Sequence, residues 1–131
     1  MAAILLDTTV LIDVLRGRPG AVERLHQLRS QDDTPFTSAV NVEEVVRGLR
    51  PTEEPTASGL MQGLRLAPLG RGEGEVAGRW RRSFAERGVT LAQADCLVAA
   101  AALGVGARLA TGNPKDFPME ELAVDHWPVG A

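Results

Sequence analysis

The sequence has few of the residues that build disulfides and soft-metal sites. Its 131 residues include one cysteine, Cys96, and two isolated histidines, His26 and His126. A single cysteine excludes an intrachain disulfide and a cysteine-based zinc site, and we interpret Cys96 as a small buried hydrophobic residue. The two histidines do not have the spacing of a helical zinc motif, so we expect neither a histidine metal centre nor a Ser-His-Asp triad.

The sequence also lacks a long apolar run. The longest, residues 96–103, has the length of a buried helix and is shorter than the roughly 18 to 20 residues that cross a bilayer. The apolar stretch 1–6 has no basic start and is too short for a signal peptide. Because 44% of the residues are apolar, the chain can form a core at this length. We therefore expect a single soluble domain over residues 1–131, with no membrane association and a cytoplasmic location.

Positive charge comes almost entirely from arginine. The net charge is −3, so the overall charge does not indicate nucleic-acid binding. Of the 14 basic residues only Lys115 is a lysine, and arginine binds phosphate in a fork geometry that lysine cannot match. The cluster of Arg79, Arg81, Arg82 and Arg87 fits a phosphate-contacting face and the solvated side of a helix equally well.

Short apolar runs alternate with helical patterns along the whole chain. Strands are expected at residues 2–6, 35–38, 64–69, 107–111 and near 123–124. Helices are expected at residues 8–16, 21–30, 41–49, 58–64, from the glycine-rich stretch 70–78 to about 87, and 90–103, with a polar break at 51–55. This alternation is typical of a three-layer α/β fold in which helices flank a central, mostly parallel sheet. Ligands of such folds bind at the carboxyl ends of the strands, where Asp7 and the loop 112–118 would meet.

Four acidic residues are candidates for a site, and each has a structural alternative. Asp7 directly follows an apolar strand, which suits either a helix N-cap or a metal or phosphate site. Glu44 follows Asn41 by three residues, so it fits the second half of a capping box as well as a site. Asp116 lies in a turn-forming loop that the apolar Phe117 would anchor, with Asn113 as a second polar candidate in that loop.

Asp95 is the strongest of the four candidates. Thr90 and Gln93 have the spacing of a capping box, so we expect the helix to begin there and Asp95 to lie too deep to cap it. Asp95 is the only charged residue between Gly88 and Arg108. A buried carboxylate needs a partner, either an ion pair or a metal ion, and we favour the metal ion.

Clustered carboxylates with few basic neighbours repel one another and raise each other's pKa. A bound Mg²⁺ or Mn²⁺ removes that conflict, because both ions prefer oxygen ligands. Such a site suits the attack of water on a phosphodiester.

Four segments of the chain resemble the PIN-domain ribonucleases, and most closely the VapC toxins of bacterial toxin–antitoxin pairs. In chain order they are LLDTTVLI at residues 5–12, NVEEVVRG at 41–48, ADCLVAAA at 94–101 and LATGNPKDF at 109–117. Each motif is loose alone, but the order and spacing of all four are specific. The resemblance covers nearly the whole chain and implies a PIN-like fold and a metal-dependent endoribonuclease that cleaves RNA.

The resemblance also implies roles for the candidate residues. Asp7 and Asp95 would bind Mg²⁺ or Mn²⁺ directly. Glu44 would complete the acidic cluster, because it stands four residues before a glycine as the family pattern requires. Members of the family place the fourth acid either where Asn113 stands or near Asp116, so Asp116 is assigned here.

The remaining implications concern supporting residues and partners. The hydroxyls of Thr8, Thr9 and Thr111 would orient the carboxylates. A cognate antitoxin would dock on the first two helices and residues 41–64, and a second copy of the chain would form a homodimer. The alternative is a catalytically weak PIN-like module that acts by binding RNA or protein.

Overall fold

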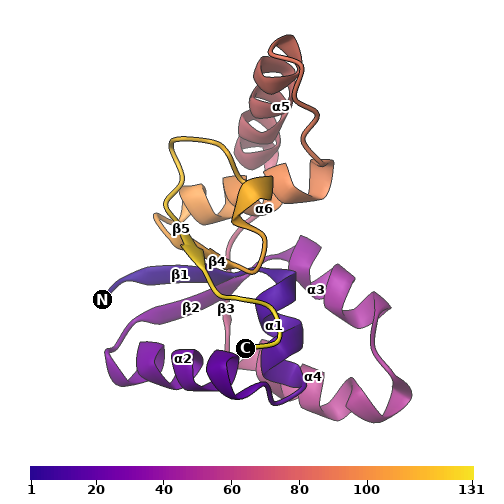
Figure 1. The fold of residues 1–131 in the computed structure, drawn as a ribbon, viewed down its shortest axis with the longest axis vertical. Helices are drawn as coiled ribbons and strands as arrows, with labels where there is room; N and C mark the ends of the chain where they lie inside the picture. The colour runs from indigo at the N-terminus through magenta and orange to yellow at the C-terminus, as the bar shows by residue number, and fades with distance from the viewer.

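Five short strands form a single sheet in a computed structural model that describes residues 1–131 (Figure 1). In chain order they are β1 (Ala3–Leu6), β2 (Thr34–Thr37), β3 (Arg65–Leu66), β4 (Arg108–Thr111) and β5 (Val124–His126). Their order across the sheet is β3-β2-β1-β4-β5, and every neighbouring pair is parallel. The central strand β1 pairs Leu5 with Phe36 on one side and with Leu109 on the other. The predicted α/β class is confirmed, and the sheet is entirely parallel.

Helices cover both faces of this sheet (Figure 1). They are α1 (Thr8–Leu15), α2 (Pro19–Ser30), α3 (Ala39–Arg47), α4 (Glu54–Gln62), α5 (Arg71–Glu86) and α6 (Gln93–Gly104), with 3₁₀ turns η1 (Pro51–Glu53) and η2 (Pro114–Asp116). In Figure 1, α1, α2 and α4 lie below the sheet, α5 and α6 lie above it, and α3 lies at the rim in contact with both α1 and α6. None of the helices combines the length and the apolar character needed to cross a bilayer.

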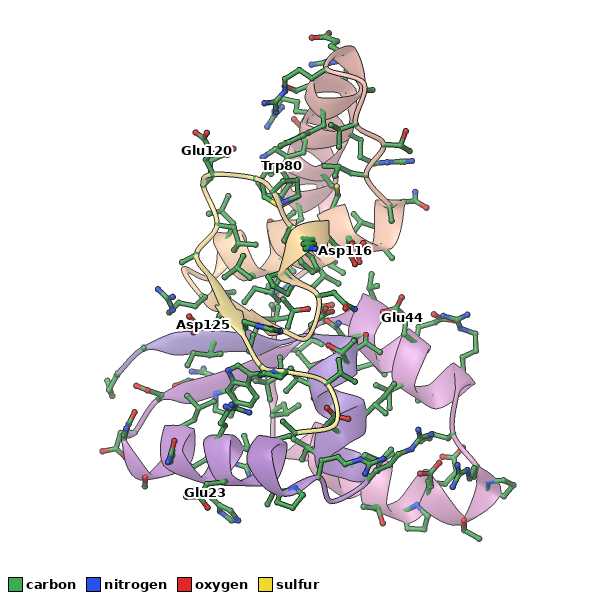
Figure 2. All side chains as sticks on the ribbon, in the orientation of Figure 1. Glu23, Glu44, Trp80, Asp116, Glu120 and Asp125 are labelled. Atoms are coloured by element: carbon green, nitrogen blue, oxygen red, sulfur yellow. The ribbon has the colours of Figure 1, made fainter.

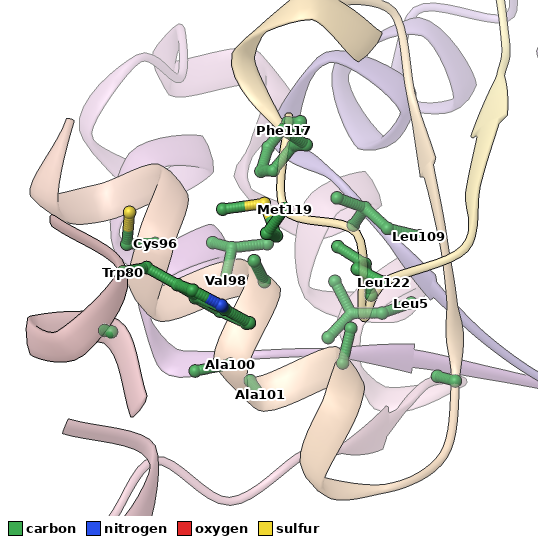
Figure 3. Close-up of a cluster of buried hydrophobic side chains, with 14 of the residues drawn as sticks. Leu5, Trp80, Cys96, Val98, Ala100, Ala101, Leu109, Phe117, Met119 and Leu122 are labelled. Atoms are coloured by element: carbon green, nitrogen blue, oxygen red, sulfur yellow. The ribbon is translucent and has the colours of Figure 1, made fainter. Parts of the chain in front are cut away.

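The strands divide their side chains between two cores because successive residues point to opposite faces. Ile4 and Leu6 pack with α1 and α2, whereas Leu5 and Leu109 pack with α6. The second core is drawn in Figure 3, where Trp80 of α5 lies against α6. Helix α6 is buried along most of its length, and its run of alanines allows close packing against the sheet.

The starts of α6 and α3 differ from those predicted in a way that bears on the site. Helix α6 begins at Gln93 with Ala92 as its N-cap residue, so Thr90 forms no capping box. Leu91 is 7% exposed and is packed into the core, and this tertiary contact overrides the local capping signal. Helix α3 begins at Ala39, where the hydroxyl of Ser38 accepts the N–H of Asn41, so the capping-box alternative for Glu44 is wrong.

Three further differences lie between residues 51 and 87. The predicted break contains η1 and the first turn of α4, where proline at the second helical position is compatible with a helix. The predicted strand at 64–69 shrinks to two residues, and Leu66 is exposed whereas Leu64 and Ala67 are buried. Helix α5 runs through the glycine-rich stretch, starting where the Glu73 carboxylate accepts the N–H of Gly70 at 2.7 Å.

Candidate active site

Asp7 lies where β1 ends and α1 begins, at the carboxyl edge of the sheet. Its backbone N–H donates to the carbonyl of Ala110 in β4 at 2.9 Å, which fixes the position of its Cα. Asp7 occupies the N-cap position of α1, but its carboxylate makes no capping hydrogen bond. Instead it accepts from the hydroxyl of Thr111 at 2.7 Å and from the amide of Asn41 at 3.3 Å. The carboxylate is therefore turned toward β4 and α3, and the N-cap alternative does not explain it.

A buried hydrogen-bond network links Asp7 to Glu44. The Asn41 side chain is fully buried, and its NH₂ group donates to Thr8 Oγ1 at 3.1 Å as well as to Asp7. Ser38 Oγ donates to Asn41 Oδ1 at 2.6 Å, and Thr8 Oγ1 donates to Glu44 Oε1 at 2.6 Å. From the sequence alone, Asn41 is predicted only as a helix cap. Its spacing of three residues from Glu44 puts both residues on one helix face, and this spacing could have indicated that Asn41 belongs to the site.

Asp95 and Asp116 approach from the other side. Asp95 is half-buried and lies in the first turn of α6, closer to the helix start than the expected cap at Thr90 implied, but Ala92 is the N-cap residue and Asp95 does not cap the helix. Asp116 is the exposed last residue of η2, and the buried Phe117 anchors this loop as predicted. Figure 2 shows Asp116 and Glu44 on the same side of the molecule, on the β4–β5 connection and on α3.

These residues line one hollow of about 270 Å³. We call it the acidic pocket; its lining is entirely polar and consists of Asp7, Thr8, Thr9, Glu44, Arg47, Asp95, Asn113 and Asp116. The structure thus brings together all four predicted acids, from four separate segments of the chain. Asn113 also lines the pocket, and its N–H donates to Thr111 Oγ1 at 3.1 Å.

The acidic pocket carries negative charge that no basic side chain balances. None of its four carboxylates forms an ion pair, and the one arginine in its lining, Arg47, is paired with Glu43 at 3.3 Å. Burial, together with the charges of Asp116, Asp7 and Glu44, raises the pKa of Asp95 to about 6. Burial also raises the pKa of Asp7, reinforced by the charge of Glu44 and opposed by the hydrogen bond from Thr111.

The donor set fits a hard divalent cation. The lining offers carboxylate, hydroxyl and amide oxygens and has no histidine or cysteine, as Mg²⁺ and Mn²⁺ prefer. No three acidic, histidine or cysteine side chains stand close enough together to enclose an ion. Mg²⁺ commonly binds through one or two carboxylates and keeps several waters, so it does not need a closed cage of side chains.

The three threonines have different roles. Thr8 and Thr111 hydrogen-bond to carboxylates, as the resemblance implies, but Thr9 does not. Thr9 Oγ1 accepts the N–H of Gly112 at 2.9 Å and so holds the start of the loop that carries Asp116. A Cβ at Gly112 would lie 2.3 Å from a methyl group of Val129, so a larger residue there would have to displace this exposed side chain.

The predicted arginine cluster lies on and just after α5, outside the acidic pocket. Arg79 lies 3.8 Å from Glu75, Arg81 donates to the carbonyl of Leu91 at 3.1 Å, and Arg87 lies over the ring of Phe84. Phosphate contact by this cluster stays a prediction.

Comparisons with known proteins agree with this arrangement. A family model described as PIN domain matches residues 4–120. Ribonuclease VapC19 of Mycobacterium tuberculosis is 34% identical over 119 residues, covering 88% of this chain and 92% of that protein. Ribonuclease VapC10 of the same organism is 34% identical over 122 residues, covering 90% and 88%.

Solved structures show the same fold. A chain in the structure of FitAcB from Neisseria gonorrhoeae aligns with a TM-score of 0.74 and 27% identity, over 92% of this chain and 95% of that one. A chain in the complex of VapBC2 from Rickettsia felis with a promoter DNA fragment aligns with a TM-score of 0.84 and 18% identity, over 95% and 98%.

Proposed function

The chain belongs to the PIN-domain family, with relatives named ribonuclease VapC, and from this premise we propose that it is a metal-dependent endoribonuclease and the toxin of a toxin–antitoxin pair. One observation carries the proposal. Four carboxylates from separate segments line one pocket without a cationic partner, and their mutual repulsion helps to raise the pKa of Asp95 to about 6. A divalent cation would balance that charge and suit the hydrolysis of a phosphodiester, and the relatives named ribonuclease support RNA as the substrate. We propose that residues 1–131 act as one domain.

We assign Asp7 and Asp95 as the direct ligands of Mg²⁺ or Mn²⁺. When bound, such an ion makes water a better nucleophile at neutral pH and stabilises the charge that develops on the phosphate. Asp7 is suited to binding because Thr111 and Asn41 fix the direction of its carboxylate before any ligand arrives.

Glu44 and Asp116 complete the proposed site. Thr8 holds one oxygen of Glu44, so the other is free to accept a hydrogen bond or a proton from the attacking water. Asp116 is the fourth acid, and its anchored loop keeps it beside Asp95.

An apolar hollow supports the proposal of an antitoxin partner. It lies between α3 and α4, has a volume of about 370 Å³ and is lined mainly by Val42, Val46, Leu49, Ala57 and Met61. Val46 is 49% exposed there, so it offers an apolar side chain to a partner. This hollow falls within the docking region predicted from the resemblance, and solved relatives include a toxin–antitoxin complex from Klebsiella pneumoniae. A homodimer stays a prediction.

Calorimetric titration with Mn²⁺ tests the metal site, and Mg²⁺-dependent cleavage of single-stranded RNA tests the reaction. We expect binding and cleavage in the wild type and loss of both in Asp95→Asn. Asp125→Asn is the matched control, because Asp125 pairs with Arg108 outside the acidic pocket. RNA binding without cleavage in any divalent metal would instead support the binding-module alternative.

A further inference from the structure

A second hollow lies against the acidic pocket. We call it the side pocket; it has a volume of about 310 Å³ and is formed by residues 89–92, which precede α6, together with Lys115 and Pro118. It shares Asp95 and Asp116 with the acidic pocket, so these two acids form the boundary between the hollows. Resting on the proposed function, we propose that the side pocket holds the base of the nucleotide next to the scissile phosphate and that Lys115 contacts the RNA backbone there.

Continuity with the acidic pocket identifies the occupant. A phosphodiester placed over the four acids has neighbouring nucleotides on both sides, and the side pocket is the space next to Asp95 and Asp116. A base can enter such a hollow only when it is unstacked and unpaired. Sequence-specific RNA recognition uses single-stranded bases of this kind, so the ligand is single-stranded RNA.

The lining of the side pocket differs from that of the acidic pocket in the way a base requires. Val89 is 41% exposed, and with Pro118 it gives an apolar surface for the flat face of a base. The exposed hydroxyl of Thr90 can donate to or accept from the edge of that base. The acidic pocket has no apolar side chain and offers no such surface.

The walls of the side pocket are held in place by contacts outside it. Arg81 of α5 donates from Nε to the carbonyl of Leu91 at 3.1 Å, and the Leu91 side chain is packed in the core. On the opposite wall, the buried Phe117 precedes Pro118 and fixes it. A pocket that is formed before binding loses less entropy when a ligand enters it.

The distribution of positive charge also supports an RNA strand that crosses the acidic pocket and enters the side pocket. Lys115 is exposed and forms no ion pair, although Asp116 is its neighbour in the chain. Arg47 lines the acidic pocket from α3 and is paired with Glu43 at the surface, so Lys115 is the unpaired cation beside the four acids. A backbone that crosses the acids can therefore place a flanking phosphate near this positive charge, where the contact contributes to affinity in a salt-dependent manner.

The test measures base preference and binding separately. A random-sequence pool of single-stranded RNA is cleaved, and the new ends are sequenced. We expect Val89→Glu to weaken or change the preference at one position beside the cut and to raise KM by about 10-fold, which corresponds to about 1.4 kcal/mol, because the apolar surface under the base is lost. Leu103→Glu is the matched control, because Leu103 is 37% exposed at the far end of α6.

Binding of the same pool, followed by fluorescence anisotropy at several salt concentrations, tests Lys115. We expect Lys115→Gln to reduce the salt slope by about 1 and to leave the base preference unchanged. Arg18→Gln is the control, because Arg18 is exposed and lies beyond the end of α1 that is far from Asp7.

The outcomes separate this inference from the proposed function. Cleavage by the wild type, with base preference and KM unchanged in Val89→Glu and an unchanged salt slope in Lys115→Gln, would overturn the side pocket and leave the nuclease intact. Absence of cleavage by the wild type in every divalent metal would overturn the nuclease itself. Binding that depends on Lys115 and Val89 but is stronger for duplex than for single-stranded RNA would also overturn the inference.

Discussion

The two walls of the acidic pocket are built in different ways. The wall from β1, α1, α3 and β4 holds Asp7 and Glu44 by hydrogen bonds of 2.6 to 3.3 Å from Thr8, Asn41 and Thr111. We call it the bonded wall. The wall from α6 and η2 carries Asp95 and Asp116, whose carboxylates have no hydrogen bond or ion pair; we call it the open wall.

This difference separates what the fold supplies from what a ligand must supply. Neutral donors on the bonded wall stabilise ionised carboxylates without adding charge. On the open wall, burial and repulsion act without opposition, and they raise the pKa of Asp95 to about 6. The carboxylates of the bonded wall are therefore oriented in advance by hydrogen bonds, whereas the charge of the open wall is left for a cation to balance.

Replacing one acid on each wall gives the largest expected contrast. Asp7→Asn keeps the shape of the side chain but removes the charge from the best-oriented proposed ligand. We expect kcat for RNA cleavage to fall by at least about 100-fold, which corresponds to about 2.7 kcal/mol in the barrier. Asp116→Asn, on an exposed loop, should lose about 10-fold. Single-turnover cleavage at saturating Mg²⁺ measures both, and an equal or larger loss in Asp116→Asn would contradict the ranking of the walls.

Loss of the hydrogen-bond network around Asn41, behind the bonded wall, gives the next largest expected effect, on stability. Asn41→Leu has a similar shape but leaves the Ser38 hydroxyl and one oxygen of Asp7 without their buried partner. We expect the free energy of unfolding to fall by about 2–3 kcal/mol, as urea denaturation would measure, because buried polar groups lose hydrogen bonds.

Thr37→Val is the matched control for that substitution. Thr37 is buried at the end of β2, one residue before Ser38, and its hydroxyl has no hydrogen-bond partner. Removing this hydroxyl should leave stability unchanged or increase it slightly. A loss in Thr37→Val as large as in Asn41→Leu would mean that packing volume, rather than hydrogen bonding, holds this wall.

Local patterns predict the positions of Asp7 and Asp95, whereas Glu44 and Asp116 are assigned only through the resemblance to the family. An apolar run that ends abruptly at Asp7 marks a buried strand, and parallel strands bring their carboxyl ends to one edge of the sheet. Asp95 was identified as an isolated acid in an apolar segment, and Phe117 correctly indicated an anchored loop.

The contacts between the acids and their neighbours depend on tertiary packing. The local capping signal predicted a helix start at Thr90, but Leu91 is buried in the core and α6 begins at Gln93. Asp95 therefore lies in the first turn of the helix. The sequence around Asn41 predicts a helix cap. In the structure α3 begins two residues earlier, at Ala39, and the Asn41 amide therefore points toward Asp7. Local sequence rules contain no information on such contacts between separate segments.

The smallest expected effect is a pH dependence of stability that arises from the open wall. The pKa of Asp95 is about 6 in the folded chain and near 3.8 in the unfolded chain. Because folding raises this pKa, protonated Asp95 contributes to the stability of the folded chain. This contribution is fully present below about pH 4 and is lost as the pH rises through about 6. Asp95 is only half-buried, so solvent screening reduces the effect to about 1 kcal/mol. Without divalent metal, the wild type should therefore gain stability relative to Asp95→Asn when the pH falls from 7.5 to 5.

Thermal denaturation at the two pH values measures that relative gain, with Asp125→Asn as the control for loss of a surface charge. Mn²⁺ should reverse the trend, since it binds the ionised carboxylates and stabilises the folded chain more at pH 7.5 than at pH 5. If the melting temperatures of the wild type and Asp95→Asn shift equally with pH, Asp95 is not the titrating group. The contrast between the bonded wall and the open wall then does not hold. If the two shifts differ and Mn²⁺ reverses the trend, the cation balances the carboxylate charge that burial and repulsion disfavour on the open wall.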